Sequence, residues 1–297
     1  MNTQTTRPAH PMPPPSASPL TPSPRRSPAF LPDGPGGGKV LLGAIGQPAG
    51  QRIVLYGTGG AGKTTLTCQA PAPLAFFDLD DSLAILRPTL PPDVQRKLSR
   101  VDCRPAWGDI RQMLHLGGWD SIRTIVIDSV TRAEELAIEH TLATVPKSNG
   151  QKARNVEDYD YGKGYVHVYD TFLTLLGDLD QHARAGRNIV LICHECAANV
   201  PNPRGEDWLR YEPRLQNPAS GKASIRLRVK EWADHVFFIG YDVDVQKGVG
   251  ASRGGRTLYP VEQPFCMAKS RTLGRELELQ KFDSTLWNTL FGESHAS

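Results

Sequence analysis

Short apolar runs alternate with segments of helical periodicity along most of this chain. The runs are Arg52–Tyr56, Leu74–Asp78, Thr124–Asp128 and Asn188–Cys193. Between the last two, apolar residues recur every three or four positions from Gly164 to Ala185, as on one face of a helix. This alternation is typical of β-α-β units, whose strands form a mostly parallel sheet flanked by helices. We therefore predict an α/β fold.

The same pattern predicts the remaining elements. Helices are expected at Lys63–Gln69, Trp107–Leu116, Ala133–Thr144 and Phe282–Phe291. The sheet is expected to resume at Val236–Gly240 and to gain late antiparallel strands at Arg256–Tyr259 and Phe265–Lys269. Residues 197–230 are rich in Pro, Asn, Arg and Gly and are too long for an ordinary connection, so we expect a long loop there.

The first 38 residues have a different composition from the rest. Proline, serine and threonine dominate them, and such a segment buries too little apolar surface to offset its ordering entropy. We predict a disordered tail at 1–38, a candidate handle for a protein partner, and one domain at 39–297. No run of about 18 apolar residues is present, so we predict a cytoplasmic protein without a membrane segment.

Charge and cysteine content change this picture little. The net charge of +3 is too small to argue for nucleic-acid binding. Cys193 and Cys196 form a Cys-x-x-Cys pair, which admits a redox or zinc interpretation. No second pair completes a four-ligand zinc site, and the favoured interpretation is that Cys193 simply ends a buried strand.

A glycine-rich segment directly after the first apolar run carries the clearest chemistry. It reads Gly57, Thr58, Gly59, Gly60, Ala61, Gly62, Lys63 and Thr64, with Thr65 next. This is the Gly-x4-Gly-Lys-Thr pattern of a phosphate-binding loop between a strand and a helix, whose backbone N–H groups face a triphosphate. Lys63 is predicted to reach the β- and γ-phosphates and Thr64 to bind Mg²⁺. The ligand is therefore predicted to be ATP with magnesium.

A second acidic position supports this prediction. The run Thr124–Asp128 delivers Asp128 to the carboxyl end of a strand, the edge at which α/β sheets bind their ligands. We predict that Asp128 holds magnesium directly or through water.

At this point the chain resembles a known family. The segments Gly62–Thr67, Ala75–Asp80 and Val126–Val130 are similar to the RecA-type P-loop ATPase core over roughly residues 50–275. Within that superfamily, the chain most resembles the small phage-encoded RecA-like, AAA-type ATPases that assist single-strand annealing and recombination. The residues that carry this finer resemblance are Cys193–Glu195, Arg210–Leu215, Lys230–Asp234 and Lys269–Arg271.

The resemblance implies further site residues. RecA-type enzymes carry a catalytic glutamate where this chain has Asp80, which is one methylene shorter; Asp78 is a competing candidate, and a solvated acidic turn is the plain alternative. His194 takes the place of a polar residue that senses the γ-phosphate, although it can also be a structural histidine. Lys269 and Arg271 match a pair that acts across a subunit boundary, which implies a homo-oligomer; the alternative is two surface cations.

Two functions fit these observations. The first is an ATPase of DNA recombination that binds single-stranded DNA through Arg210, Arg214 and Arg226 in the segment 197–230, with nearby aromatic residues for base stacking. The acidic residues of that segment leave a solvated charged loop as its alternative. The second function is a protein-partner switch or loader that hydrolyses ATP without touching DNA itself.

Overall fold

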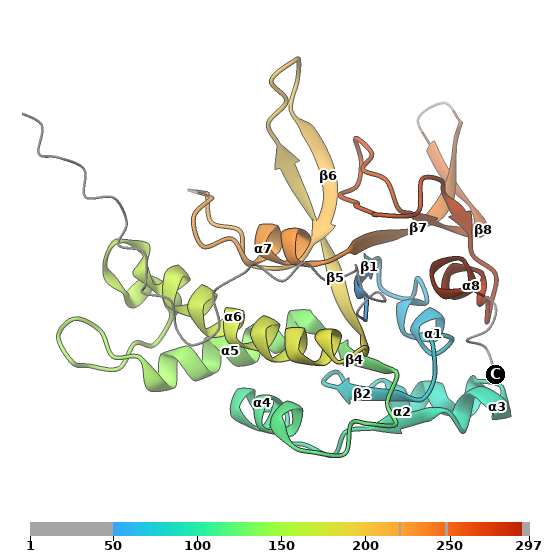
Figure 1. Cartoon of the computed structure of the whole chain (residues 1–297). Coiled ribbons are helices and arrows are strands. Elements are labelled where there is room, and N and C mark those ends of the chain that lie inside the picture. The colour runs from blue at the N-terminus through green and yellow to red at the C-terminus, as the bar shows by residue number, and fades with distance from the viewer. Residues whose placement is uncertain (1–49, 220, 247–248, 293–297) are drawn as a thin grey trace, which may run out of the picture. The chain divides into compact units, whose positions relative to one another are not determined.

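A row of parallel strands forms the centre of the protein. The computed structural model describes residues 50–292 apart from 220 and 247–248. The parallel strands follow one another across the sheet in the order β3 (Leu98–Arg100), β2 (Leu74–Asp78), β4 (Thr124–Asp128), β5 (Asn188–Val200), β1 (Arg52–Gly57) and β7 (His235–Gln246). Antiparallel strands β8 (Val249–Tyr259) and β9 (Leu277–Glu278) continue the sheet beyond β7, and β6 (Trp208–Pro213) pairs with the far end of β5 (Figure 1).

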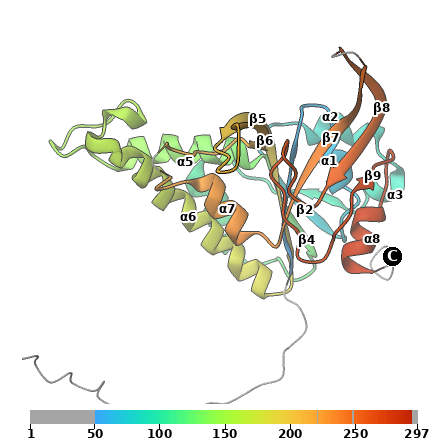
Figure 2. The same ribbon diagram turned by 90° about the horizontal axis from the view of Figure 1, so that it is seen from above.

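Helices cover both faces of this sheet (Figure 2). One face carries α4 (Trp107–His115), α5 (Val130–Thr144), α6 (Lys163–Arg184) and α7 (Ile225–Trp232). The other carries α1 (Lys63–Thr67), α2 (Leu83–Leu86), α3 (Pro92–Gln95) and α8 (Thr285–Phe291). Short 3₁₀ turns occur at η1 (Arg87–Thr89), η2 (Val156–Asp158) and η3 (Asp160–Gly162). The predicted α/β fold, with a mostly parallel sheet and late antiparallel strands, is confirmed.

The central strands are apolar throughout because both of their faces are buried. Along β1, Ile53 and Leu55 face one hydrophobic cluster, whereas Val54 and Tyr56 face the other. Successive side chains of a strand point to opposite faces, so a strand covered by helices on both sides needs a continuous apolar run. The same requirement explains the runs in β2, β4 and the first part of β5, which are likewise buried.

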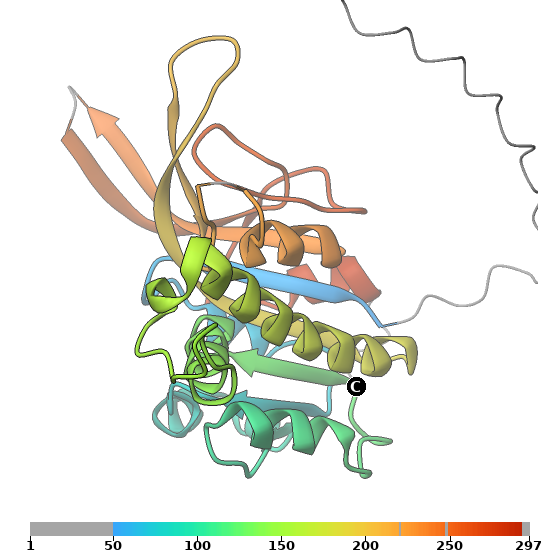
Figure 3. The ribbon, with the colours of Figure 1, turned by 90° about the vertical axis from the view of Figure 1, so that its left-hand side faces the viewer.

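The segment 197–230 differs most from its prediction. It is not a long loop. Strand β5 continues past Cys193 as far as Val200, returns as β6, and the chain then forms helix α7. The β5–β6 hairpin therefore projects from the sheet as a regular two-stranded element, which is seen well in Figures 1 and 3. The predicted strand Phe265–Lys269 is also wrong, because this segment makes only isolated bridges to β6 and β7.

The domain boundaries predicted from composition are only partly within reach of the structure. The described residues belong to one compact unit, Gln47–Ser297. The predicted tail 1–38, and the predicted domain start at 39, lie outside the described residues. Among the helices of the described part, none is long and apolar enough to cross a membrane.

Candidate functional site

The carboxyl ends of four neighbouring strands meet at one edge of the sheet. Asp78 at the end of β2 is paired in register with Asp128 at the end of β4, and Gly57 at the end of β1 is paired with His194 of β5. Strand β5 lies between β1 and β4, so the glycine-rich loop and Asp128 face each other across it. A cavity of about 350 Å³ opens at this edge. Its lining residues are Gly59, Gly60, Gly62, Lys63, Thr64, Thr65, Asp80, Ser82, Leu86, Asp128, Ile192 and His194.

The glycine-rich loop between β1 and α1 folds around its own lysine. The Lys63 ammonium is buried and donates hydrogen bonds to the carbonyl oxygens of Gly57 (2.6 Å) and Thr58 (3.1 Å). Burial lowers the pKa of Lys63, and the nearby carboxylates of Glu195 and Asp128 oppose this shift. A charged group held in this way is available to exchange carbonyl partners for phosphate oxygens.

Gly57 must be glycine for the loop to leave β1. Its φ is +151°, and a Cβ atom there would lie 2.1 Å from the carbonyl oxygen of Ile239 on β7. Any side chain would therefore push β7 away from β1 at the point where the loop begins.

Thr64 and Asp128 form a contact suited to magnesium. The Thr64 hydroxyl donates a hydrogen bond of 2.8 Å to Asp128 Oδ2. Burial raises the pKa of Asp128 to about 6, and the carboxylates of Asp80 and Asp78 add to the rise, whereas the Thr64 hydrogen bond and Lys63 oppose it. Hydroxyl and carboxylate oxygens are the hard ligands that Mg²⁺ prefers. These two residues therefore fit a magnesium ion, which would supply positive charge to bound phosphates.

The structure separates the two candidates for the catalytic carboxylate. Asp78 is buried, and its two oxygens accept hydrogen bonds from the backbone N–H groups of Ser82 (3.0 Å) and Leu83 (3.1 Å). Its carboxylate thus holds the start of α2. Asp80 lines the phosphate cavity with 32% of its side chain exposed. Asp80 is therefore better placed than Asp78 to reach a water molecule.

His194 lies beside Asp80 in the same cavity. Its Nε2 is 3.5 Å from Asp80 Oδ2, and 40% of its side chain is exposed. The backbone of His194 is fixed on both sides, because its N–H donates to the Thr131 hydroxyl (3.1 Å) and its carbonyl accepts from the N–H of Arg214 (2.8 Å). The imidazole is thus held at the cavity, at the point where β5 leaves the sheet to form the hairpin.

Two of the three predicted DNA-binding arginines are not available to a ligand. Arg210 and Arg226 are buried and both pair with Glu212, and Arg210 also pairs with Glu262. Both arginines neutralise a buried carboxylate at the base of the hairpin, so a contact with DNA phosphate would require breaking these pairs. Arg214 alone of the three is exposed.

Lys269 and Arg271 do not converge on one point as two residues of a strand would. The Lys269 ammonium donates to the carbonyl oxygens of Lys230 (3.0 Å), Glu231 (3.2 Å) and Ala233 (2.6 Å), and so caps the carboxyl end of α7. Arg271 pairs with Asp234 at 2.9 Å. The backbone of Lys269 pairs with Val236 near the start of β7, whereas the phosphate loop follows the carboxyl end of β1. All three donors of Lys269 serve the fold, which argues against its predicted role toward a neighbour's nucleotide.

Within the described residues, the Cys-x-x-Cys pair forms no disulfide and belongs to no metal-binding cluster. Cys193 and Cys196 are both free thiols, and no metal-binding cluster of His, Cys, Asp or Glu occurs within the described residues. Cys193 is buried, its thiol lies 3.2 Å from the Thr131 hydroxyl, and burial raises its pKa to about 12. It packs as part of the buried portion of β5.

Two residues at the site have no motif in the sequence. Thr131, which fixes the backbone of His194, is the second residue of α5. Arg256 reaches the phosphate loop from the distant strand β8 and donates to the Ala61 carbonyl at 2.9 Å. Neither has a local signal that distinguishes it from an ordinary helix threonine or strand arginine.

The fold and this site together define a class of protein. The order of the parallel strands, the phosphate loop after β1 and the acidic residue at the end of β4 are those of a P-loop ATPase of the RecA-like type. The family model AAA_24, described as an AAA domain, matches residues 49–272. The chain therefore belongs to this family. No curated protein matches the chain at a significant level.

Three solved structures are similar to this chain at low identity and low TM-score. The flagellar accessory protein FlaH from Methanocaldococcus jannaschii is 11% identical, with 72% of this chain and 78% of that chain covered and a TM-score of 0.35. The KaiC-like protein PH0186 from Pyrococcus horikoshii OT3 is 15% identical, with coverages of 72% and 80% and a TM-score of 0.37. An ATPase from the type III secretion system of pathogenic bacteria is 18% identical, with coverages of 65% and 52% and a TM-score of 0.39.

Proposed function

We propose that this protein hydrolyses ATP with magnesium and acts on single-stranded DNA, as part of recombination or strand annealing, with a homo-oligomer as its working form. The observation that carries the proposal is the position of His194. This residue lines the phosphate cavity and directly precedes the part of β5 that pairs with β6. Binding or hydrolysis of ATP in the cavity could therefore shift His194 and, with it, the start of the projecting β5–β6 hairpin.

The residues of the cavity support hydrolysis. Lys63 supplies positive charge for the transferring phosphoryl group, and Thr64 and Asp128 would hold magnesium. Asp80 is free to orient and deprotonate the attacking water, and His194 beside it can hold the carboxylate in place or donate to phosphate. The residues proposed to supply charge, magnesium ligands and the base thus all line one cavity.

The β5–β6 hairpin offers a surface for single-stranded bases. Trp208 is 41% exposed and its neighbour Leu209 is 68% exposed. A half-exposed indole presents a flat face on which bases of any sequence can stack. Arg204 and Arg214 are exposed on the same hairpin, but Glu206 and Asp207 offset their charge. We therefore assign most of the affinity to stacking and expect only a shallow dependence on salt.

The test is binding of a fluorescent single-stranded oligonucleotide by anisotropy, with and without ATP and magnesium, alongside ATP turnover. We expect wild type to bind more tightly with ATP. Trp208→Ala should weaken binding by about tenfold, within the range for loss of one base–aromatic stack, and Trp208→Phe should restore most of it. Lys63→Ala should hydrolyse no ATP and lose the effect of ATP on DNA binding.

The outcomes separate the two candidate functions. Wild type that hydrolyses ATP but shows no DNA affinity at low salt would favour the partner switch, for which the exposed pair Trp208 and Leu209 would then be a protein-binding surface. Unchanged hydrolysis by folded Lys63→Ala would contradict the assignment of the phosphate site itself.

A further inference from the structure

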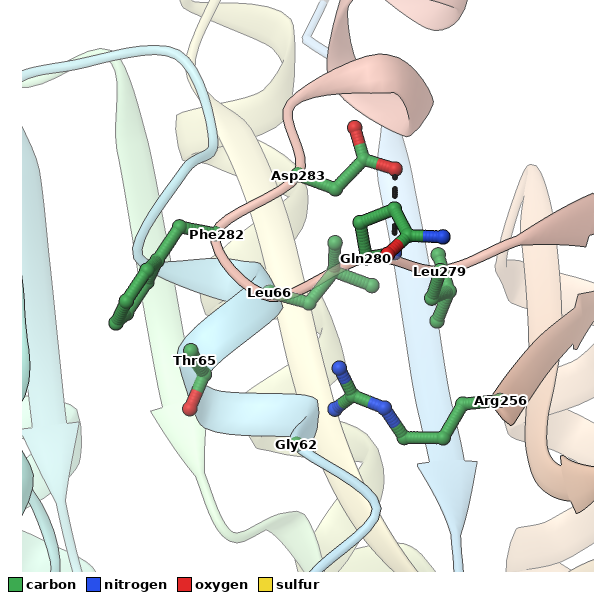
Figure 4. A pocket seen from close by; sticks show the side chains of 8 residues that line it. All are labelled: Gly62, Thr65, Leu66, Arg256, Leu279, Gln280, Phe282 and Asp283. Carbon is green, nitrogen blue, oxygen red and sulfur yellow. Dashed lines mark hydrogen bonds between the residues drawn. The ribbon is translucent and has the colours of Figure 1, made fainter. Parts of the chain in front are cut away.

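A cation from a distant strand lies against the outer side of the phosphate loop. Arg256 belongs to β8, and its Nη1 donates a hydrogen bond of 2.9 Å to the carbonyl oxygen of Ala61. Figure 4 shows its side chain extending from β8 toward Gly62 at the start of α1. The contact joins residues that are 195 positions apart in the sequence.

Arg256 has no acidic partner within the described part of the chain. None of the carboxylates in the described part of the chain forms an ion pair with it. Two acidic residues of this region have other partners: Asp242 accepts from the Thr257 hydroxyl (2.7 Å), and Asp283 accepts from the N–H of Thr285 (2.7 Å). Among the described residues, no carboxylate therefore pairs with this positive charge, which lies next to the loop that is predicted to hold a triphosphate.

The hydrogen bond to Ala61 also fixes the orientation of one loop peptide. In a planar trans peptide, the carbonyl oxygen and the following N–H point in opposite directions. Because Arg256 holds the Ala61 oxygen on the outer side of the loop, the Gly62 N–H is directed to the opposite side. Gly62 lines the phosphate cavity. An N–H group that is aimed in advance at a bound anion costs no reorganisation when the anion binds.

The identity of residue 62 fits this arrangement. Gly62 has φ of +86°, and a Cβ atom at this position would lie 2.2 Å from Arg256 Nη1. A side chain at residue 62 would displace the guanidinium group and strain the backbone. The close approach of Arg256 to the loop therefore depends on this glycine.

The end of the chain holds Arg256 and α1 together. The N–H of Leu279 donates to the Arg256 carbonyl (2.7 Å), and the Trp287 indole N–H donates to the carbonyl of Leu66 in α1 (2.7 Å). Strand β8 thus contacts the loop before α1 at Ala61, and helix α8 contacts the other end of α1 at Leu66. These contacts make the position of the loop relative to β8 well defined.

We propose that Arg256 is a positioning residue for the triphosphate: it orients the Gly62 N–H toward the phosphates and adds positive charge on the outer side of the loop. This inference rests on the proposed function, since it assigns a further residue to the same ATP site. It acts on the phosphate half of the nucleotide, not on the base or the ribose. Arg256 should therefore strengthen the binding of inorganic tripolyphosphate as much as it strengthens the binding of ATP.

Steady-state kinetics can test this assignment. Arg256→Gln removes the charge and should raise KM for ATP by about tenfold, equivalent to about 1.4 kcal/mol, with kcat changed by less than about twofold. The inhibition constant of tripolyphosphate should rise by the same factor. Arg256→Lys keeps the charge and should recover much of the loss. Arg275→Gln is the matched control, because Arg275 is an exposed arginine of the same region and its replacement changes the net charge equally.

Each outcome decides the inference. If wild type hydrolyses ATP and the KM of Arg256→Gln equals that of Arg275→Gln, the role of Arg256 is overturned and the proposed function still stands. Equal losses in Arg256→Gln and Arg256→Lys, together with a lowered Tm of the nucleotide-free protein, would reduce Arg256 to a structural residue. Wild type that binds neither ATP nor tripolyphosphate would overturn the proposed function and the inference with it.

Discussion

Asp128→Asn should stabilise the nucleotide-free protein while it abolishes magnesium-dependent ATP turnover. Asp128 is 4% exposed and lies near two further carboxylates, Asp78 and Asp80. Asparagine has nearly the same shape and keeps an oxygen that can accept the hydrogen bond from Thr64. The substitution therefore removes a buried negative charge and leaves its surroundings in place.

The size of the effect follows from the pKa of Asp128. Burial raises that pKa from 3.8 to about 6. Each pKa unit corresponds to about 1.4 kcal/mol, so ionised Asp128 costs the folded protein up to about 3 kcal/mol. Between about pH 4 and pH 6, the folded state keeps a proton that the unfolded state has released, so this contribution makes stability fall as pH rises. Above about pH 6 the full cost is present.

Urea unfolding without nucleotide or magnesium measures this directly. We expect Asp128→Asn to exceed wild type in free energy of unfolding by about 1–3 kcal/mol at pH 7.5, and by much less at about pH 4.5. Asp80→Asn should give a smaller gain, because its carboxylate is a third exposed and its charge adds less than burial does to the raised pKa of Asp128. A variant that is no more stable than wild type at pH 7.5, or that gains equally at both pH values, would refute the argument.

Two further predictions concern the other carboxylates. Asp80→Asn should lower kcat by about a hundredfold or more with nucleotide binding nearly unchanged. Asp78→Asn should mainly lower the Tm, because Asp78 holds the start of α2. The reverse pattern in turnover and melting would assign the catalytic role to Asp78. Glu212→Gln should lower the free energy of unfolding by about 3–5 kcal/mol, since Arg210 and Arg226 would be left buried without a full counter-charge. A loss below about 1 kcal/mol in urea unfolding is no more than an exposed ion pair contributes, and it would show that this network is not important for stability.

Local features of the sequence determined the sheet and the phosphate loop. A strand buried on both faces must be apolar along its length, so β1, β2 and β4 are recognisable without any knowledge of their neighbours. The loop Gly57–Thr64 is equally local, since its glycines, lysine and threonine act through a contiguous stretch of backbone. Asp128 could be placed because parallel strands end at a common edge.

Only the tertiary structure decided which charged side chains remain free. Arg210 and Lys269 looked available in the sequence, but Glu212 and Glu262 bind the first, and the end of α7 binds the second. Arg256 carried no motif and proved to contact the phosphate loop. Apolar periodicity can be recognised within each element, whereas the partner of a charged side chain depends on packing between elements that are far apart in the chain. For this reason the sequence specified where phosphates are predicted to bind, and the fold specified which cations lie beside that loop.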